Sequence, residues 1–196
     1  MDSKKGFRAN IFNLTTAAML LAAAQLLPLI TGHIPQIGRM LCPMHIPVLL
    51  CGFICGPLWG GIIGFTAPFL KYITVGIPVL FPIGIAMAFE LAAYGIIAGL
   101  HIPMISRKEN KITGKYIINL YIALIDSMLC GRIVYGIAMF ILMAAGKNSY
   151  SFTAFLTEGF AEALPGIILQ LAVIPPLFIA VSALRRYELE KRSLSE

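Results

Sequence analysis

Residues 45–80, HIPVLLCGFICGPLWGGIIGFTAPFLKYITVGIPVL, constrain the fold more than any other part of the chain. This stretch of 36 residues contains a single Lys, Arg, Asp or Glu, which is Lys71. This stretch is therefore not exposed to water over most of its surface, and lipid or protein must cover it. A bilayer core takes about 20 helical residues, and Gly56-Pro57 disfavours a continuous helix. We predict two short helices, about 45–56 and 57–74, joined by a tight cytoplasmic turn.

Four glycines recur at every fourth position of the same stretch: Gly52, Gly56, Gly60 and Gly64. Small residues at this spacing let membrane helices approach closely, because packing replaces the hydrophobic drive in lipid. We interpret these glycines as a packing surface rather than as a functional motif.

The composition places the whole chain in a membrane. Of its 196 residues, 59% are hydrophobic and 12% are charged, and the mean hydropathy is +0.87. A soluble domain carries about 25% charged residues. The chain is therefore an integral membrane protein, organised as a single membrane domain over residues 1–196.

The basic residues indicate the orientation of the chain in the membrane. The net charge is +6, but its placement does not resemble a nucleic-acid footprint. Eleven of the fifteen Lys and Arg residues fall into three clusters that fit cytoplasmic helix ends. The clusters are Lys4, Lys5 and Arg8; Arg107, Lys108, Lys111 and Lys115; and Arg185, Arg186, Lys191 and Arg192.

Apolar runs and helix breakers predict an all-α, polytopic protein with six transmembrane helices and both termini in the cytoplasm. The predicted helices are about 13–30, 45–56, 57–74, 82–102, 116–145 and 165–185. We expect an amphipathic outer segment at about 152–163, and outer loops at 31–44, 75–81 and 147–164 that close over a solute.

The first predicted helix carries a strip of small side chains. Ala18 and Ala22 form a small-xxx-small pair, which provides a smooth surface for another helix. We favour a contact with another protein over packing within this chain.

Ionisable and polar residues inside the predicted spans mark the functional site, since such groups are expensive in a membrane. Glu90 lies about 12 Å below the outer end of the fourth helix, with Tyr94 one turn deeper. Arg132 and Tyr135 lie one turn apart on the fifth helix. Gln170 lies about 8 Å below the outer end of the sixth. These depths are similar enough to predict one outward-facing substrate-binding pocket.

A structural alternative stays open for two of these residues. Glu90 and Arg132 are opposite charges on neighbouring helices, and the alternative is that they serve only to lock those helices together. Asp126 lies nearly on the opposite face of the fifth helix from Arg132, which indicates a structural or partner-facing role.

The sequence contains no motif for catalysis or for a metal. There is no HExxH pattern, the three histidines (His33, His45 and His101) are scattered, and no Gly-rich phosphate loop is present. The cysteines form no CxxC pair. We therefore expect no enzyme and no metal site. A solitary carrier driven by an ion gradient, with Glu90 as its proton-coupling group, is the alternative to a binding component.

Five segments, in this order and spacing, carry a resemblance to a known family. They are LTTAAMLLAAAQLLP at 14–28, MHIPVLLCGFICGP at 44–57, FPIGIAMAFELAAYG at 81–95, GRIVYG at 131–136 and LPGIILQLAVIP at 164–175. Over about residues 14–184 the chain resembles the substrate-binding S components of energy-coupling factor (ECF) vitamin transporters.

This resemblance implies a six-helix protein of the bacterial cytoplasmic membrane that binds a small water-soluble vitamin from outside. It also implies partners, namely a transmembrane coupling protein and two ABC ATPases, which use the ATP in place of this chain. The chain itself would need no cofactor. In that family a small-xxx-small alanine motif on the first helix docks the coupling protein, and Ala18 and Ala22 occupy the matching positions.

The nature of the ligand is left open at this point. The pattern looks most like the general group of S components that includes pantothenate carriers, and a pantothenate carboxylate suits Arg132. Glu90 in the same pocket instead favours a ligand with a donor or a positive site. An aminopyrimidine, pyridoxine or queuine would meet that condition.

Overall fold

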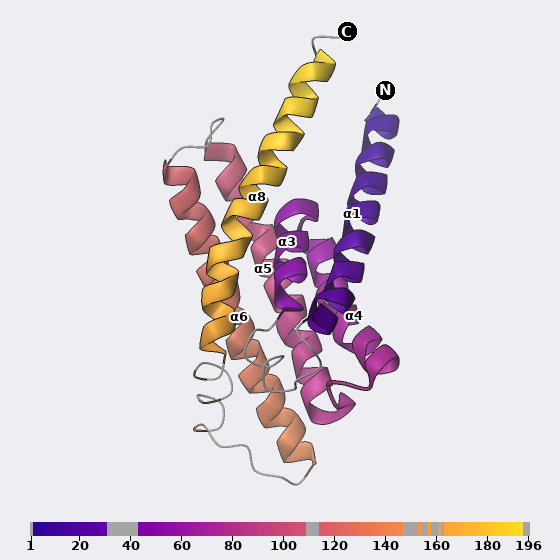
Figure 1. Ribbon diagram of the computed structural model, residues 1–196, viewed down its shortest axis with the longest axis vertical. Helices are drawn as coiled ribbons and strands as arrows, with labels where there is room; N and C mark the ends of the chain where they lie inside the picture. Colours follow the sequence, from indigo (N-terminus) through magenta and orange to yellow (C-terminus); the bar gives the residue numbers. More distant parts are fainter. Residues whose placement is uncertain are drawn as a thin grey trace.

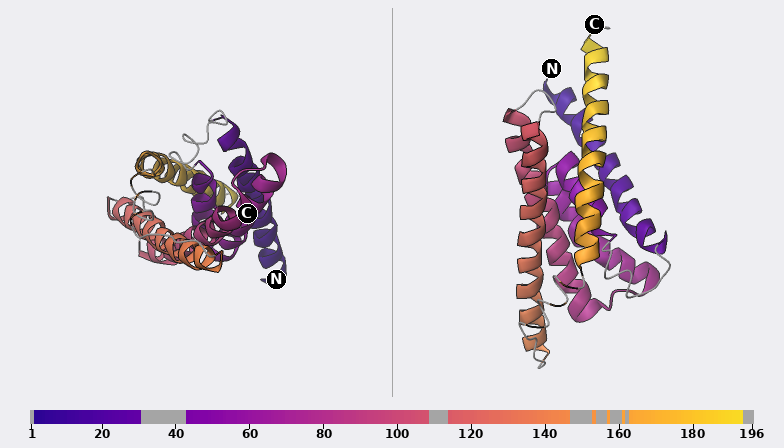
Figure 2. Two further views of the ribbon diagram at one scale, coloured as in Figure 1. Left: turned by 90° about the horizontal axis from the view of Figure 1, so that it is seen from below. Right: turned by 60° about the vertical axis from the view of Figure 1, so that its left-hand side comes forward.

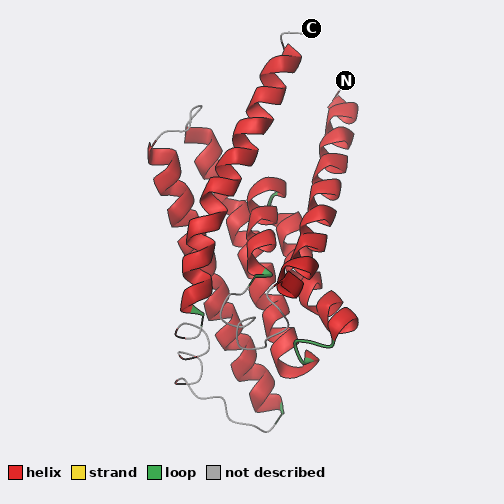
Figure 3. Ribbon diagram, in the orientation of Figure 1, coloured by secondary structure: helices red, strands yellow, loops and turns green. Residues whose placement is uncertain are grey.

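The structure is a computed structural model. It describes residues 2–30, 43–108, 114–146 and 163–193, together with residues 153, 157 and 161, and side chains within 10–28, 43–102, 114–146 and 163–184. The described residues are almost entirely helical and include no strand (Figure 3). The predicted all-α class is therefore confirmed.

Six helices of more than ten residues make up the bundle in the described ranges (Figure 1). They are α1 (Asp2–Ile30), α3 (His45–Cys55), α4 (Pro57–Val75), α5 (Ile85–Lys108), α6 (Gly114–Ala145) and α8 (Leu164–Ser193). A π-helical turn, η1 (Leu80–Gly84), precedes α5. All of these helices except α3 are long and apolar enough to cross a bilayer, so the chain is a multi-pass membrane protein.

Helix α3 differs from the prediction of six full transmembrane helices. Its 11 residues extend about 16 Å, whereas the hydrocarbon core is about 30 Å thick. Every residue from Pro43 to Phe53 is buried. The helix therefore begins inside the bundle, surrounded by α1, α4, α5 and α8, and not at the membrane surface.

Three other helices extend beyond their predicted limits. Helix α1 begins at Asp2 instead of residue 13, and α8 continues to Ser193 instead of 185. Both extensions contain several Lys or Arg residues, and the α8 extension also contains two Glu; these residue types favour helix. Helix α5 runs through Pro103 to Lys108, beyond its predicted end at residue 102. The expected amphipathic segment 152–163 and the outer loops near 31–44 and 147–164 lie almost wholly outside the described residues.

Both termini lie at the same end of the bundle, as Figures 1 and 2 show. The end of α5 and the start of α6 lie at that end as well. These are the ends that carry the basic clusters, so the positive-inside rule places them in the cytoplasm. The opposite end, where α1 ends and α8 begins, faces outward.

Glycines bring the backbones of α3, α4 and α5 into direct contact. A Cβ atom on Gly60 would lie 2.5 Å from the carbonyl oxygen of Gly95 and 2.7 Å from Cα of Gly52. This confirms the interpretation of Gly52 and Gly60 as packing surface. Gly56 has a different role, because its φ of 93° in the turn between α3 and α4 suits only glycine.

Candidate solute-binding site

Glu90 of α5 is the centre of a buried polar cluster. Its side chain is almost fully enclosed, since the residue is 1% exposed. The Tyr94 hydroxyl donates a hydrogen bond to Glu90 Oε1 over 3.1 Å. Arg132 Nη1 lies 3.0 Å from the same oxygen. The structure thus brings together three of the five predicted site residues in direct contact.

A glycine on α6 sets the contact between these helices. The Tyr94 ring packs against Gly131, where a Cβ atom would lie 2.6 Å from the ring. Because Gly131 leaves room for the ring, α5 and α6 approach closely at this level. The next residue along α6, Arg132, is thereby placed opposite Glu90, which lies one turn from Tyr94.

In the structure Glu90 of α5 and Arg132 of α6 pair with each other. Both are buried, at 1% and 7% exposure. A buried charge without a partner is costly, so the pair stabilises each member. This finding does not remove the two residues from the site, since Tyr94 and a histidine approach the same carboxylate.

That histidine, His45, is a member of the cluster that the sequence did not reveal. It is 2% exposed, and its Nε2 lies 3.6 Å from Glu90 Oε1. Its ring meets the Tyr94 ring edge-on, with centroids 5.2 Å apart. In the sequence His45 follows an outer loop, so it would lie at the membrane surface if α3 crossed the whole bilayer. Only the shortness of α3 puts it at the depth of Glu90.

Gln170 of α8 reaches the same level of the bundle from another side. It is 1% exposed. Phe178 of α8 contacts Phe53 of α3, with ring centroids 5.4 Å apart. The two helices run in the same direction, and Gln170 and His45 each precede their phenylalanine by eight residues, or about 12 Å. Gln170 and His45 therefore lie at about the same depth.

Tyr135, the fifth predicted site residue, packs elsewhere. It is 8% exposed and belongs to a separate apolar cluster with Ala86 and Met139. This cluster lies one helical turn nearer the outside than Arg132. Tyr135 therefore sits above the polar cluster, toward the side from which a solute arrives.

A second polar pair joins α5 and α6 on their outer surface. His101 Nε2 lies 3.2 Å from Asp126 Oδ2, and the two side chains are 25% and 45% exposed. The Cys130 thiol approaches Asp126 Oδ1 at 3.8 Å. As the sequence indicated, Asp126 does not face the Glu90 cluster, and its pairing with His101 is a structural role.

The alanine strip of α1 faces away from the protein. Ala18 and Ala22 are exposed, whereas Ala17 and Ala24 on the other side of the helix are buried in the core. Gln25 ties α1 to α4, since its Nε2 donates a hydrogen bond to the Ala67 carbonyl over 3.0 Å. The Ala18–Ala22 face is thus available for contact with another molecule.

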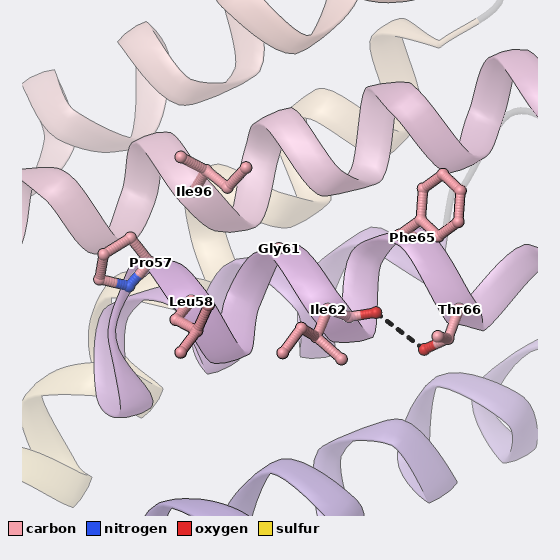
Figure 4. Close-up of a pocket in the computed structure, with 7 residues that line it drawn as sticks. All are labelled: Pro57, Leu58, Gly61, Ile62, Phe65, Thr66 and Ile96. Atoms are coloured by element: carbon pink, nitrogen blue, oxygen red, sulfur yellow. Dashed lines mark hydrogen bonds between the residues drawn. The ribbon is translucent and has the colours of Figure 1, made fainter.

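An apolar groove of about 610 Å³ follows the outer surface of α4 and α5. Its lining is Pro57, Leu58, Gly61, Ile62, Phe65, Thr66 and Ile96 (Figure 4). The one hydroxyl in it, that of Thr66, already donates a hydrogen bond to the Ile62 carbonyl over 2.9 Å. This groove offers no free polar group to orient a vitamin, and none of the predicted site residues lines it.

The fold and the buried cluster define a multi-pass membrane protein with a polar site enclosed by four helices. A search of protein families agrees with this class and makes it specific. The model of the ECF transporter substrate-specific component matches residues 12–178. The chain therefore belongs to the family of substrate-specific components of ECF transporters. The match does not distinguish the pantothenate-type group from the others. Neither a curated protein nor a solved structure matches the chain significantly.

Proposed function

We propose that this chain captures a small water-soluble vitamin or a related ring compound from outside and delivers it inward through an ECF module. The observation that carries the proposal is the enclosed cluster around Glu90. Four helices contribute polar side chains at one depth, in a bundle whose other buried residues are almost all apolar. An apolar pocket with few placed polar groups is typical of small-molecule sites.

The cluster also lies on the correct side of the bilayer for capture. The buried residues Glu90 and Gln170 are near the beginnings of α5 and α8, which are the outward ends of those helices. Beneath them the core is closed by apolar residues such as Leu120, Leu124 and Ile174. A solute would therefore enter from outside, and delivery inward would require the partner module.

The direct test is to identify a bound molecule. We expect the purified, full-length chain to release about one equivalent of a small ring compound on denaturation, detected by mass spectrometry. We also expect uptake into membrane vesicles to require the coupling protein, the ATPases and ATP. Uptake by this chain alone, abolished by dissipating the proton gradient, would contradict the proposal and favour a solitary secondary carrier.

The second part of the proposal is that the Ala18–Ala22 face docks the coupling protein. Both residues are exposed and contribute no core packing. We expect Ala18→Trp to abolish co-purification with the coupling protein, because the indole would hold the partner helix away. Ligand binding should be unchanged.

A matched control for this variant is Ile122→Trp on α6. Ile122 is 56% exposed, and α6 lies across the bundle from α1 (Figures 1 and 2). The control should leave the complex intact. If the complex also survives Ala18→Trp, the alanine face is not the docking surface.

A further inference from the structure

The pair formed by His101 of α5 and Asp126 of α6 lies on the surface of the bundle that faces lipid. His101 Nε2 is 3.2 Å from Asp126 Oδ2, and the two side chains are 25% and 45% exposed. On α6, Ile122 and Leu129 flank Asp126 and are 56% and 49% exposed. A charged carboxylate in such surroundings is expensive, because hydrocarbon does not solvate it. Its charge must therefore be offset.

The pair lies well inside the membrane. Both residues belong to membrane-spanning segments, Leu80–Ile102 and Gly114–Ala145. Asp126 follows Lys115, the last residue of the second basic cluster, by 11 residues, or about 16 Å of helix. The hydrocarbon core is about 30 Å thick. Water at the cytoplasmic surface is therefore too far away to solvate the Asp126 carboxylate.

The contacts of the His101 ring show where its hydrogens lie. Nδ1 is 2.9 Å from the carbonyl oxygen of Ile97, one turn earlier on α5. A carbonyl oxygen only accepts hydrogen bonds, so Nδ1 carries a hydrogen. A neutral imidazole has one ring hydrogen, which would leave Nε2 as an acceptor. Nε2, however, faces Asp126 Oδ2, and an ionised carboxylate only accepts as well.

Two acceptors repel each other at 3.2 Å, so a second hydrogen lies between Nε2 and Oδ2. The hydrogen belongs either to the ring, giving an imidazolium beside a carboxylate, or to Asp126, giving a carboxylic acid beside a neutral ring. Both forms contain the same number of protons, and both have a net charge of zero. Without that proton the pair carries one negative charge.

The groups around the pair were compared helix by helix. On α6, the Cys130 thiol donates to Asp126 Oδ1 over 3.8 Å. The nearest described cation on α6, Arg132, pairs with Glu90 instead. The side chains of Arg107 and Lys108, at the end of α5, lie outside those that the structure describes. The residues of α3 and α4 that lie against this part of α5 do not titrate, and they are Gly52, Gly56 and Pro57.

We propose that His101 and Asp126 form a proton-binding site, which holds one shared proton on the lipid-facing surface of α5 and α6. The proton offsets the carboxylate charge in hydrocarbon and supplies the hydrogen bond between the two helices at this level. Its loss leaves a negative charge and two facing acceptors, so the bond between the helices is lost with it. The inference does not depend on the proposed function, because the pair is separate from the Glu90 cluster.

The protons can be located by NMR of the full-length protein in lipid nanodiscs, with isotope labels in the histidine rings and the aspartate carboxyls. The His101 signals are assigned by their loss in His101→Gln, and the Asp126 signal by its loss in Asp126→Asn. We expect hydrogen on Nδ1 of His101. As the pH is raised, the His101 ring and the Asp126 carboxyl should change together. A neutral ring with hydrogen on Nε2 alone would overturn the proposal, as would separate titration of the two groups.

Asp126→Asn is the decisive variant, because its amide can donate a hydrogen bond to Nε2 without an additional proton. We expect the His101 ring to stay neutral, with its hydrogen on Nδ1, over the pH range in which the wild type loses the shared proton. The His45 signals should not change, which makes them an internal control. If His101 titrates in this variant as it does in the wild type, the proton is not shared.

His101→Gln gives the reciprocal measurement if Asp126→Asn does not fold, and the Asp126 signal is then the one missing in both variants' comparison with the wild type only when Asp126 is replaced. In His101→Gln the Asp126 carboxyl should no longer titrate at the pH of the joint change. An unchanged Asp126 titration in this variant would contradict the shared proton.

The effect of the proton on helix packing is measured by backbone hydrogen exchange around 97–102 and 122–130. Above the pH of the joint change, exchange should be roughly tenfold or more faster in the wild type than in Asp126→Asn, as expected for the loss of one hydrogen bond to a charged group. Below that pH the two proteins should exchange alike. Comparison at equal pH removes the direct effect of pH on exchange. Equal exchange on both sides would show that the proton does not join the helices.

Discussion

The pairing of Glu90 with Arg132 can be tested by removing each charge and then both. The two side chains are 1% and 7% exposed and their charged atoms are 3.0 Å apart. Arg132→Met removes the positive charge, so that among the described residues Glu90 keeps the Tyr94 hydroxyl and the His45 ring as neighbours. Glu90→Gln removes the negative charge that faces the Arg132 guanidinium. The double variant leaves neither charge.

The expected magnitudes follow from burial. Removal of one member of a buried ion pair typically costs about 3–5 kcal/mol, because the remaining charge is uncompensated, whereas replacing both is often nearly neutral. We expect each single variant to lose roughly this amount of stability. The double variant should regain most of the lost stability, although the Tyr94 hydroxyl then faces the neutral amide introduced by Glu90→Gln.

Thermal unfolding in detergent, without ligand, is a suitable measurement. Cys51 and Cys55 are buried in α3, so a thiol-reactive dye reports on the opening of the core. Cys42 and Cys130 would first be replaced by Ala, which leaves these two thiols as the reporters. Ser127→Ala is the matched control, because Ser127 is buried on α6, as Arg132 is, and donates its hydrogen bond to the Ala123 carbonyl of the same helix. The loss of stability in Ser127→Ala should stay at ~1 kcal/mol.

Additive losses in the double variant, within about 0.5 kcal/mol of the sum, would refute the pairing. Wild-type stability of Arg132→Met would refute it as well, since the Glu90 carboxylate would then have found another partner. Either outcome would show that the ion pair does not hold α5 and α6 together.

Two further variants test the packing around the cluster. Tyr94→Phe removes the 3.1 Å hydrogen bond to Glu90 but keeps the ring on Gly131. The free energy of unfolding should fall by about 1.5–3 kcal/mol, the value of a hydrogen bond to a charged group. No change in the same thermal assay would show that the bond contributes nothing. Gly95→Leu places a side chain against the backbone of Gly60, so the yield of folded protein should fall sharply. The control is Ile96→Leu, the neighbouring position on the surface of α5. A normal yield of Gly95→Leu would contradict the close approach of the helices.

Much of the fold could be predicted from the sequence because the bilayer imposes few solutions. Apolar runs, the Gly56-Pro57 break and the basic clusters were sufficient to predict an all-α, multi-pass membrane protein. The helix ends in water were not predictable in the same way. Charged residues after Leu184 are compatible with either helix or coil, and hydropathy does not distinguish these two states.

The site was predictable only in part. Glu90, Arg132 and Gln170 stood out because polar residues in apolar helices are expensive. Whether Glu90 and Arg132 pair depends on the register of α5 against α6, which Gly131 sets and a single sequence does not reveal. His45 was missed because its depth follows from the 11-residue length of α3. Tyr135 was placed in the site by its spacing from Arg132, yet it packs one turn above.

The glycine contacts among α3, α4 and α5 have a mechanical consequence. Where backbone meets backbone, no long side chains remain that can change rotamer and let one helix slide along another. We therefore expect α3, α4 and α5 to move as one rigid unit. Any tilt of α4 at the lipid surface would carry the Glu90 carboxylate of α5 with it. Helix α8, which carries Gln170, contacts this group through α3.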